Sequence, residues 1–339
     1  DISSQGRGML RFVSKELQAY KNCGDLQFGF SIVRCIGSNK KESCKEDTLV
    51  PFSCKNRGFC PSCASRRMHS RSIHLEENVI PPVPMRQWVV TLPFKLRFMV
   101  AQDDELLKEI SRICKREISK YIRSQSKPRF TRYRDSGFIN FIQRSSSDLA
   151  LNYHFHFLVT EGEYVWHGKP NKVPKFLRIA EPSNQDVEKV LKRIRNRVVA
   201  HLINNSKYDV LTQPFAESFE EEELNSFGQI KVASVSRQIA LGSRRGRPVR
   251  RIGASLGSTG EDVSFNSPRS ARVNGFSLHA NRLIEADNRE DLSFMLRYLA
   301  RGELSLDRLS EDENKDIILT LKRPFSDGTT AVKFSPMEL

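Results

Sequence analysis

The stretch LALNYHFHFLVTEG, residues 149–162, decides the fold class because two kinds of side chain alternate along it. In an extended strand, successive side chains point to opposite faces. One face would carry Asn152, His154 and His156. The other face would be apolar and would carry Leu151, Tyr153, Phe155, Phe157 and Val159. We therefore predict a strand over residues 149–159 that is buried on one side and presents two imidazoles on the other.

Two histidines on one strand face can bind a divalent metal, or they can be ordinary surface or hydrogen-bonded residues. The pattern alone leaves both interpretations open. A second strand is predicted at residues 138–143, and only residues 144–148 separate it from the histidine strand. An antiparallel pairing of the two would place the histidines inside a sheet. The expected fold class is α+β, with a central antiparallel sheet flanked by helices.

Helical apolar spacing predicts the elements that would cover this sheet. Asp103 and Asp104 can cap a helix that runs to Ile122, and Cys114 would lie inert on its buried stripe. Further helices are expected over residues 186–203 and 289–300, the latter ended by Gly302. Residues 276–284 form another strand candidate, and residues 317–322 and 329–334 a hairpin around Asp327-Gly328.

The charge of the chain favours a polyanionic partner. Its 339 residues include 55 Lys and Arg against 40 Asp and Glu, a formal charge of +15. Residues 108–134 hold ten Lys or Arg and two Glu, which favours a nucleic-acid surface over a merely solvated helix. The Gly, Ser and Arg-rich residues 242–260 would suit phosphate contacts, although such a loop can also be simply soluble. The predicted DNA-binding residues there are Arg244, Arg245, Arg247, Arg250 and Arg251.

Apolar runs in the chain are shorter than the roughly 20 residues that span a bilayer, so a cytosolic protein is expected. The first residue, Asp1, and the ending Met337-Glu338-Leu339 suggest a chain trimmed at both ends. The proline-rich residues 81–84 predict a boundary between a domain of residues 1–82 and a larger one of residues 83–339.

Five of the seven cysteines crowd into residues 35–63, which favours metal binding over disulfides. Cys60 and Cys63 have the two-residue spacing of a zinc knuckle. Cys35 and Cys44 are the predicted second pair, although eight residues separate them, and Cys54 is an alternative ligand. We expect a closed structural zinc site; a redox pair or unliganded thiols are the alternatives.

Seven segments in unchanged order resemble the tyrosine transposases of the insertion sequence 91 type, including the related common-region elements. The resemblance covers nearly the whole chain. The segments are AYKNCGDLQFGF, VPFSCKNRGFCPSCASRRM, VIPPVPMRQWVVTLPFKLRF, FIQRSSSDLALNYHFHFLV, NGFSLHAN, LRYLARGELSLDRL and LKRPFSDGTTAVKF.

This resemblance implies an N-terminal zinc-binding domain followed by an HUH nuclease domain. His154 and His156 would hold Mg²⁺ or Mn²⁺ against a scissile phosphate, and Tyr298 would be the nucleophile. Phe294 stands where two-tyrosine members carry another tyrosine, so the chain resembles the single-tyrosine members. The widened spacing between Cys35 and Cys44 departs from the family pattern and leaves the zinc ligands open.

The implied reaction is rolling-circle-like transposition of single-stranded DNA at element ends, through a 5′-phosphotyrosine link, in the cytoplasm of a bacterium at its nucleoid. Two histidines make an incomplete metal site, and Gln143 and His279 are the candidates for a third ligand. The alternatives are a related HUH relaxase or replication initiator, a non-catalytic zinc-dependent DNA-binding protein, and a hydrolase that uses the cysteine-bound zinc.

Overall fold

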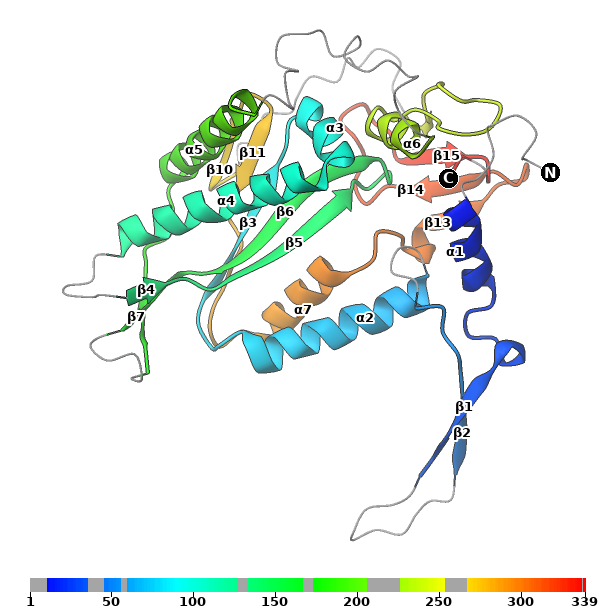
Figure 1. The fold of residues 1–339 in the computed structure, drawn as a ribbon, viewed down its shortest axis with the longest axis horizontal. Coiled ribbons are helices and arrows are strands. Elements are labelled where there is room, and N and C mark those ends of the chain that lie inside the picture. Colours follow the sequence, from blue (N-terminus) through cyan, green and yellow to red (C-terminus); the bar gives the residue numbers. More distant parts are fainter. Residues whose placement is uncertain are drawn as a thin grey trace. The chain divides into compact units, whose positions relative to one another are not determined.

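The computed structural model describes residues 11–35, 46–55, 60–126, 133–166, 173–205, 226–253, 267–336 and 338–339 (Figure 1). The chain divides into two compact units. The first comprises Asp1–Arg71 with Arg301–Asp307, and the second comprises Ser72–Ala300 with Arg308–Leu339.

The division after Arg71 differs from the boundary that the prolines at residues 81–84 predicted. Leu75 and Ile80 lie before those prolines, yet both pack into a hydrophobic cluster of the second unit. Apolar burial therefore joins the segment before the prolines to the larger unit.

The first unit contains α1 (Arg11–Lys21), the short 3-10 helix η2 (Leu26–Phe28), and a two-stranded antiparallel ribbon of β1 (Phe30–Arg34) and β2 (Asp47–Pro51). The Asp25 carboxylate caps η2 by accepting a hydrogen bond of 2.9 Å from the Gln27 backbone N–H. Helix α2 (Pro61–His74) starts in this unit with proline at its first position, where a missing N–H costs nothing.

The second unit is built on an antiparallel sheet with the strand order β10-β11-β3-β6-β5, and β12 also pairs with β3. The histidine strand is β6 (Leu151–Thr160), which lies between β3 (Met85–Thr91) and β5 (Phe138–Ser145). The remaining strands are β10 (Ser270–Val273), β11 (Phe276–His279) and β12 (Leu283–Ile284). The predicted α+β class with antiparallel sheets is confirmed.

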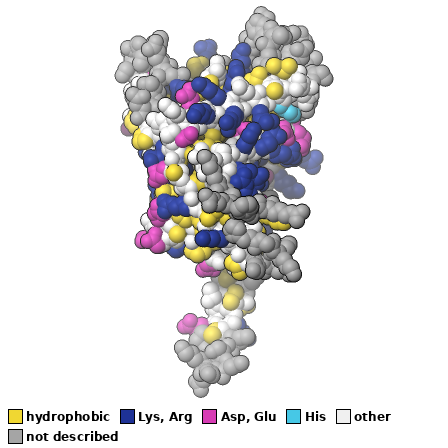
Figure 2. All heavy atoms as spheres, turned by 90° about the vertical axis from the view of Figure 1, so that its left-hand side faces the viewer, with side chains coloured by type: hydrophobic (Ala, Val, Ile, Leu, Met, Phe, Trp, Pro, Cys, Tyr) yellow, Lys and Arg dark blue, Asp and Glu magenta, His cyan; other side chains and the backbone are white. Residues whose placement is uncertain are grey.

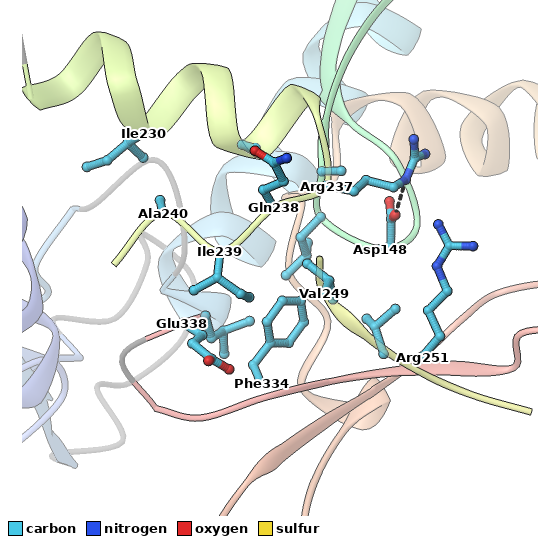
Figure 3. A pocket seen from close by; sticks show the side chains of 15 residues that line it. Asp148, Ile230, Arg237, Gln238, Ile239, Ala240, Val249, Arg251, Phe334 and Glu338 are labelled. Atoms are coloured by element: carbon cyan, nitrogen blue, oxygen red, sulfur yellow. Dashed lines mark hydrogen bonds and ion pairs between the residues drawn. The ribbon is translucent and has the colours of Figure 1, made fainter. Parts of the chain in front are cut away.

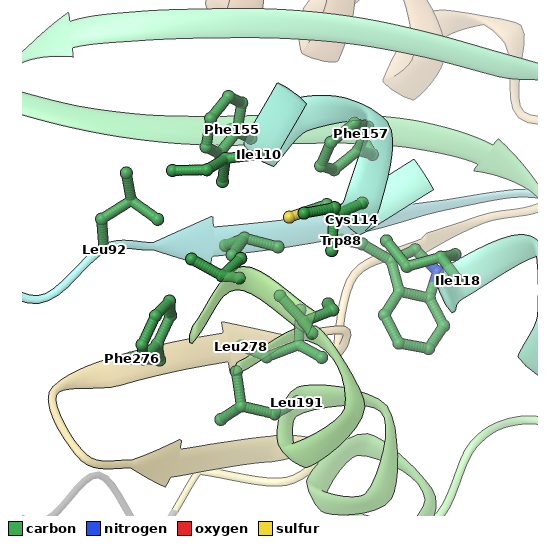
Figure 4. Packing of buried hydrophobic residues seen from close by; sticks show 14 of the residues in the cluster. Trp88, Leu92, Ile110, Cys114, Ile118, Phe155, Phe157, Leu191, Phe276 and Leu278 are labelled. Carbon is green, nitrogen blue, oxygen red and sulfur yellow. The ribbon is translucent and has the colours of Figure 1, made fainter. Parts of the chain in front are cut away.

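One face of this sheet supports the main hydrophobic core (Figure 4). Phe155 and Phe157 from β6 and Trp88 from β3 pack there with helix residues such as Ile110 and Cys114. The core helices are α3 (Phe94–Gln102), α4 (Asp104–Gln125), α5 (Asn184–Ile203) and α6 (Ser226–Val235). Burial raises the pKa of the Cys114 thiol, so this cysteine is inert, as predicted.

Side-chain caps fix where the two long core helices begin. Asp103 accepts hydrogen bonds from the backbone N–H groups of Glu105 and Leu106 and so starts α4. Ser183 and Asp186 form a reciprocal capping box at the start of α5. Local sequence therefore sets the position of both helices against the sheet.

The opposite face of the sheet carries a smaller cluster beneath α7 (Arg289–Ala300). The packed face of α7 consists of Leu292, Met295, Leu296 and Leu299. It contacts Leu158 of β6 together with Ile139 and Phe141 of β5. The π-helical turn η3 (Leu75–Val79) contributes Leu75 to the same cluster.

Two smaller sheets complete the second unit. One has the order β13-β14-β15-β9, formed by Leu309–Glu311, Ile317–Thr320, Ala331–Phe334 and Arg250–Ile252. It contains the hairpin predicted around Asp327-Gly328. The other has the order β4-β7-β8, formed by Tyr133–Asp135, Gly162–Trp166 and Lys175–Arg178. The 3-10 helix η5 (Leu306–Arg308) precedes β13.

A buried ion pair closes one end of the central sheet. Arg86 of β3 is fully buried, and its Nε lies 2.8 Å from both carboxylate oxygens of Glu161, just after β6. Its Nη1 donates to the carbonyl oxygen of Ala280 at 2.7 Å. Glu181 lies further away, at 3.6 Å from Arg86 Nη2. Because Arg86 and Glu161 are both removed from water, loss of Glu161 would leave the buried guanidinium with only this more distant carboxylate.

We predict that Glu161→Gln lowers the free energy of unfolding by about 3–5 kcal/mol, measured by urea denaturation. Glu188→Gln is the matched control, because Glu188 lies 2.6 Å from Lys192 in a solvent-exposed helical pair. Its effect is expected to stay within about 0.5 kcal/mol. Equal small effects of the two substitutions would contradict a structural role for the buried pair.

Candidate metal centres and catalytic face

Four cysteines of the first unit converge on one point. The sulfur atoms of Cys23, Cys54, Cys60 and Cys63 lie within 4.8 Å of one another. The separations are 3.7 Å for Cys23–Cys63 and 3.6 Å for both Cys54–Cys63 and Cys23–Cys60. A zinc–sulfur distance of about 2.3 Å in a tetrahedron requires sulfur–sulfur edges of about 3.8 Å. The four side chains therefore fit a tetrahedral zinc site.

Backbone pairing across the ribbon brings this group together. The Gly24 N–H donates to the carbonyl oxygen of Phe52 at 3.1 Å, which places Cys23 beside the segment that contains Cys54. The Cys54 N–H in turn donates to the Cys23 sulfur at 3.4 Å. Cys60 and Cys63 come from the start of α2, one helical turn apart.

The group contains Cys60, Cys63 and the alternative ligand Cys54, but Cys23 stands in place of the predicted Cys35. Cys35 follows β1 at the Arg34–Asp47 end of the ribbon, whereas Cys23 and Cys54 lie at the opposite, Phe30–Pro51 end. Cys44 lies outside the described residues. The sequence signal for Cys23 was its place just before the ribbon, matched by Cys54 just after it.

The pKa values of two cysteines in this group are shifted in opposite directions. Burial alone would raise the pKa of Cys63, but hydrogen bonds from Cys54, from Cys23 and from the Lys55 backbone lower it to about 7. Burial raises the pKa of the neighbouring Cys60. Zinc binds thiolates, so a lowered pKa of Cys63 is consistent with a zinc ligand.

In the second unit, the strand register places His154 and His156 on one face of the central sheet. His154 lies opposite Gln143 of β5 and Thr91 of β3, and His156 lies opposite Val89 of β3. The two imidazole centroids are 5.0 Å apart. Leu158, two residues after His156 on β6, points to the same face and packs against α7. The histidines therefore lie on the face of the sheet that α7 covers.

Hydrogen bonds at Nδ1 orient both rings. His154 Nδ1 lies 2.7 Å from the carbonyl oxygen of Asn152, which can only accept, so Nδ1 donates. His156 Nδ1 lies 2.9 Å from Gln87 Nε2. Metal-binding histidines commonly donate from their second nitrogen, as His154 does. The Gln87 amide nitrogen is itself a donor, so His156 Nδ1 accepts and the proton of the neutral ring lies on Nε2.

A ligand would approach the two rings at their Nε2 atoms, because both Nδ1 atoms already have partners. His154 Nε2 lies 3.1 Å from Gln143 Oε1. When the ring is neutral, the Asn152 carbonyl holds the proton on Nδ1, so Nε2 and Oε1 both carry lone pairs. A cation between them would remove that repulsion. His156 Nε2 is buried and has no hydrogen-bond partner among the described residues. Two imidazole nitrogens and an amide oxygen are donors that Mn²⁺ accepts, and the carboxamide oxygen also suits Mg²⁺.

The environment keeps His156 neutral. Burial, followed by the proximity of His154, lowers its pKa to about 3. A metal ligand must be unprotonated, so coordination through His156 Nε2 requires the Gln87 amide to turn its oxygen towards Nδ1, which places the ring proton on Nδ1.

The two candidates for a third ligand are placed differently. Gln143 is already at hydrogen-bonding distance from His154. His279 pairs with Val89 of β3, and β3 separates it from His156, so the two backbones are about 10 Å apart at ~4.8 Å per strand. The geometry favours Gln143.

Tyr298 lies on the flank of α7. At 100° per residue it is about 105° around the helix from the centre of the packed stripe, and its side chain is 38% exposed against 58% for Phe294. Arg289, at the start of α7, donates to the carbonyl oxygen of Ile80. From there the helix runs towards the end of the sheet that holds the β5–β6 turn (Figure 1). Tyr298 is thus near the end of the helix that covers the histidine face.

The predicted arginine loop has intramolecular partners. Arg244 and Arg250 both lie 3.3 Å from Glu338, and Arg251 lies 2.6 Å from Asp327. Arg245 donates to the side-chain oxygen of Gln229 at 2.9 Å, while Arg247 is exposed. Four of the five guanidinium groups therefore stabilise the fold, and DNA contact by this loop stays a prediction.

A cavity of about 150 Å³ lies beside the β5–β6 turn (Figure 3). The Arg237 guanidinium at its wall lies 2.7 Å from Asp148. Burial would raise the pKa of the Asp148 carboxyl, but the charge of Arg237, followed by hydrogen bonds, keeps that pKa below its usual range. Ile239, Val249 and Phe334 supply apolar walls. The Arg237 and Asp148 charges at this cavity are paired with each other. The cavity therefore lies at the packing contact between the β5–β6 turn and the sheet that contains β9 and β15.

Comparison with protein families assigns both parts of the chain. Residues 2–92 match a transposase zinc-binding domain of the insertion sequence 91 type, and residues 137–339 match a putative transposase family. No curated protein and no solved structure matched.

The matches define a DNA-processing enzyme of the transposase class that carries a zinc module. The chain belongs to the transposases of the insertion sequence 91 type. DNA is accordingly its partner, and the zinc-binding domain together with the four-cysteine group supports a structural Zn²⁺. Among the described residues, no helix has the length and apolar character required to span a membrane.

We predict that Cys23→Ser lowers the zinc content of the purified chain well below one ion per chain, measured by elemental analysis. Cys35→Ser is the matched control and is expected to retain one zinc, because the Cys35 sulfur is not in the tetrahedral group. The reverse pattern would restore Cys35 to the ligand set.

Proposed function

We propose that this transposase nicks and rejoins single-stranded DNA at the ends of its element through a covalent tyrosine intermediate, by a rolling-circle-like route. The observation that carries the proposal is the convergence on one sheet face of the histidine pair, the Gln143 oxygen and the helix that bears Tyr298. A single tyrosine on α7, with Phe294 one turn earlier, suits one covalent link at a time.

The proposed step is a transesterification. The Tyr298 oxygen attacks a phosphodiester phosphorus, the bond from phosphorus to the 3′ oxygen breaks, and the DNA is left with a 5′-phosphotyrosine and a free 3′-hydroxyl. The phenolic proton leaves as the new ester forms, and the 3′ oxygen takes up a proton. A second 3′-hydroxyl reverses the reaction on another strand. The ester bond is conserved, so no nucleotide cofactor is needed.

His154, His156 and Gln143 would hold Mg²⁺ or Mn²⁺ beside the scissile phosphate. Such an ion supplies polarisation of the phosphate and stabilisation of its developing negative charge. The Asn152 carbonyl oxygen, and the Gln87 side-chain oxygen once that amide is turned, would accept from the two Nδ1 atoms and leave both Nε2 atoms as donors to the ion. Burial of His156 strengthens these electrostatic interactions by excluding water.

The cysteine group would hold zinc through Cys23, Cys54, Cys60 and Cys63. Four thiolates close a tetrahedron and leave no open position for a reacting water, which argues against a zinc-dependent hydrolase. Its role in the proposal is to fix the ribbon and the start of α2, as part of a module that grips DNA.

Tyr298→Phe is expected to abolish the covalent protein–DNA adduct. The measurement is a denaturing gel after incubation of the chain with Mn²⁺ and single-stranded oligonucleotides that carry the element end. Tyr20→Phe removes a partly exposed phenol of the first unit and should leave the adduct unchanged. Undiminished adduct with Tyr298→Phe would assign the nucleophile elsewhere. If the parent chain binds Mn²⁺ but forms no adduct with the DNA, a non-catalytic DNA-binding protein would be favoured.

Gln143→Leu is expected to weaken Mn²⁺ binding at least tenfold. Gln87→Leu removes the side chain that holds the His156 ring and is expected to weaken Mn²⁺ binding by about 10–100-fold. Isothermal titration of the zinc-loaded chain with Mn²⁺ measures both without relying on catalysis. His279→Leu is the control and should bind Mn²⁺ as the parent does. A loss confined to His279→Leu would make His279 the third ligand instead.

A further inference from the structure

Four aromatic side chains share one face of the small β4-β7-β8 sheet. Tyr133 of β4 pairs directly with Trp166 of β7, and Tyr164 of β7 pairs directly with Phe176 of β8. Directly paired residues point to the same side, and residues 164 and 166 also share a side because side chains alternate. The rings of Tyr164 and Phe176 are 5.2 Å apart. We call this set the aromatic face.

The opposite face of the same sheet is turned towards the protein. Val165 is fully buried there, and the buried Glu163 is bonded to Ser126 at the end of α4. Arg123 and Arg134 lie 3.6 and 3.7 Å from the same carboxylate. These contacts anchor the sheet, so the aromatic face is the one left outward.

Exposure and shape agree with an outward orientation. Tyr133 is 53% exposed, and Trp166, Tyr164 and Phe176 are partly exposed. A hollow of about 510 Å³ is bordered by Tyr133, Arg134, Asp135 and Trp166. It has room for a flat ring system between or upon these side chains.

The described surroundings of the aromatic face are basic. In its strands and the last turns of α4, the described charged residues are Lys120, Arg123, Arg134, Lys175 and Arg178 against Asp135 and Glu163. Figure 2 looks at this end of the molecule, and Lys and Arg side chains gather over its upper half. Lys175 and Arg178 on β8 are exposed beside Phe176.

We propose that the aromatic face is a stacking platform for unpaired bases of the DNA strand. Bases stack on aromatic rings whatever their sequence, and nearby cations hold the phosphates. The core of a protein-binding patch is instead depleted of charge. The combination of exposed rings with an excess of positive charge fits a single strand better than a protein partner or a second copy of this chain.

The position of the platform suits a strand that also reaches the histidine face. Trp166 follows His156 by ten residues along β6 and β7, which is at most about 33 Å of extended chain. The platform would therefore hold DNA several nucleotides away from the bond that is cut. This inference shares with the proposed function only the premise that the partner is single-stranded DNA.

Tryptophan fluorescence provides a local test, because the chain has two tryptophans and Trp88 is only 2% exposed. The zinc-loaded full chain, carrying Tyr298→Phe to prevent cutting, is titrated with oligothymidylate without added Mg²⁺ or Mn²⁺. Stacking on Trp166 is expected to quench its emission, and fluorescence anisotropy of labelled DNA gives the dissociation constant in parallel.

Trp166→Ala and Tyr133→Ala are each expected to weaken binding roughly tenfold to hundredfold, the range for loss of one stacked base. Trp166→Phe keeps a ring and should restore most of the affinity while it removes the quenching. Phe227→Ala is the matched control, because Phe227 is an exposed aromatic residue outside the platform. Unchanged Trp88 emission and thermal unfolding would show that each variant is folded.

Folded Trp166→Ala that binds oligothymidylate as tightly as the parent would overturn the platform. The absence of quenching at saturating DNA would also overturn it. Self-association of the chain that Tyr133→Ala abolishes would overturn it as well. The platform and the proposed chemistry fail separately. Ring-dependent DNA binding without any Tyr298 adduct would retain the platform and reject the chemistry, and an adduct without ring-dependent binding would do the opposite.

Discussion

The pairing of β6 between β3 and β5 is the constraint on which the rest of the second unit depends. Its backbone groups bond to strands on both sides, and its side chains alternate between the main core and the histidine face. A slip of one residue would turn His154 and His156 into the core and bring Phe155 and Phe157 out. Burial of those two rings therefore fixes the direction of the imidazoles.

The histidine face shows how a small hydrophobic cluster can position chemistry. Leu158 continues the alternation that begins with His154 and His156, and it packs under α7. The same contacts that bury Leu296 and Leu299 also set the axis of the helix that bears Tyr298. Packing at this cluster and the geometry of the proposed reaction are thus coupled, while the rings themselves are turned by Asn152 and Gln87.

The cysteine group and the proposed histidine site are built on opposite principles. The four cysteines enclose their centre with soft sulfur donors, which suits an ion that only holds structure. The histidine pair with Gln143 offers fewer and harder donors, so an ion bound there would keep coordination positions for a phosphate. In the proposed scheme, the aromatic face adds a third kind of contact, in which ring stacking and a basic surface hold the strand away from the reacting bond.

The sequence by itself determined the features that depend on near neighbours along the chain. The alternation over residues 149–159, the caps Asp103 and Ser183, and the knuckle of Cys60 and Cys63 are local patterns. Only the tertiary structure decided which distant residues meet. Cys23 joins Cys54 because a ribbon pairs its two flanks, and Gln143 rather than His279 meets His154 because β5 adjoins β6 directly. Likewise, acidic residues from the C-terminal sheet and its loops reach most of the loop arginines, and strand pairing gathers the aromatic face. Such contacts follow from strand order and register, which residue type and local spacing do not specify.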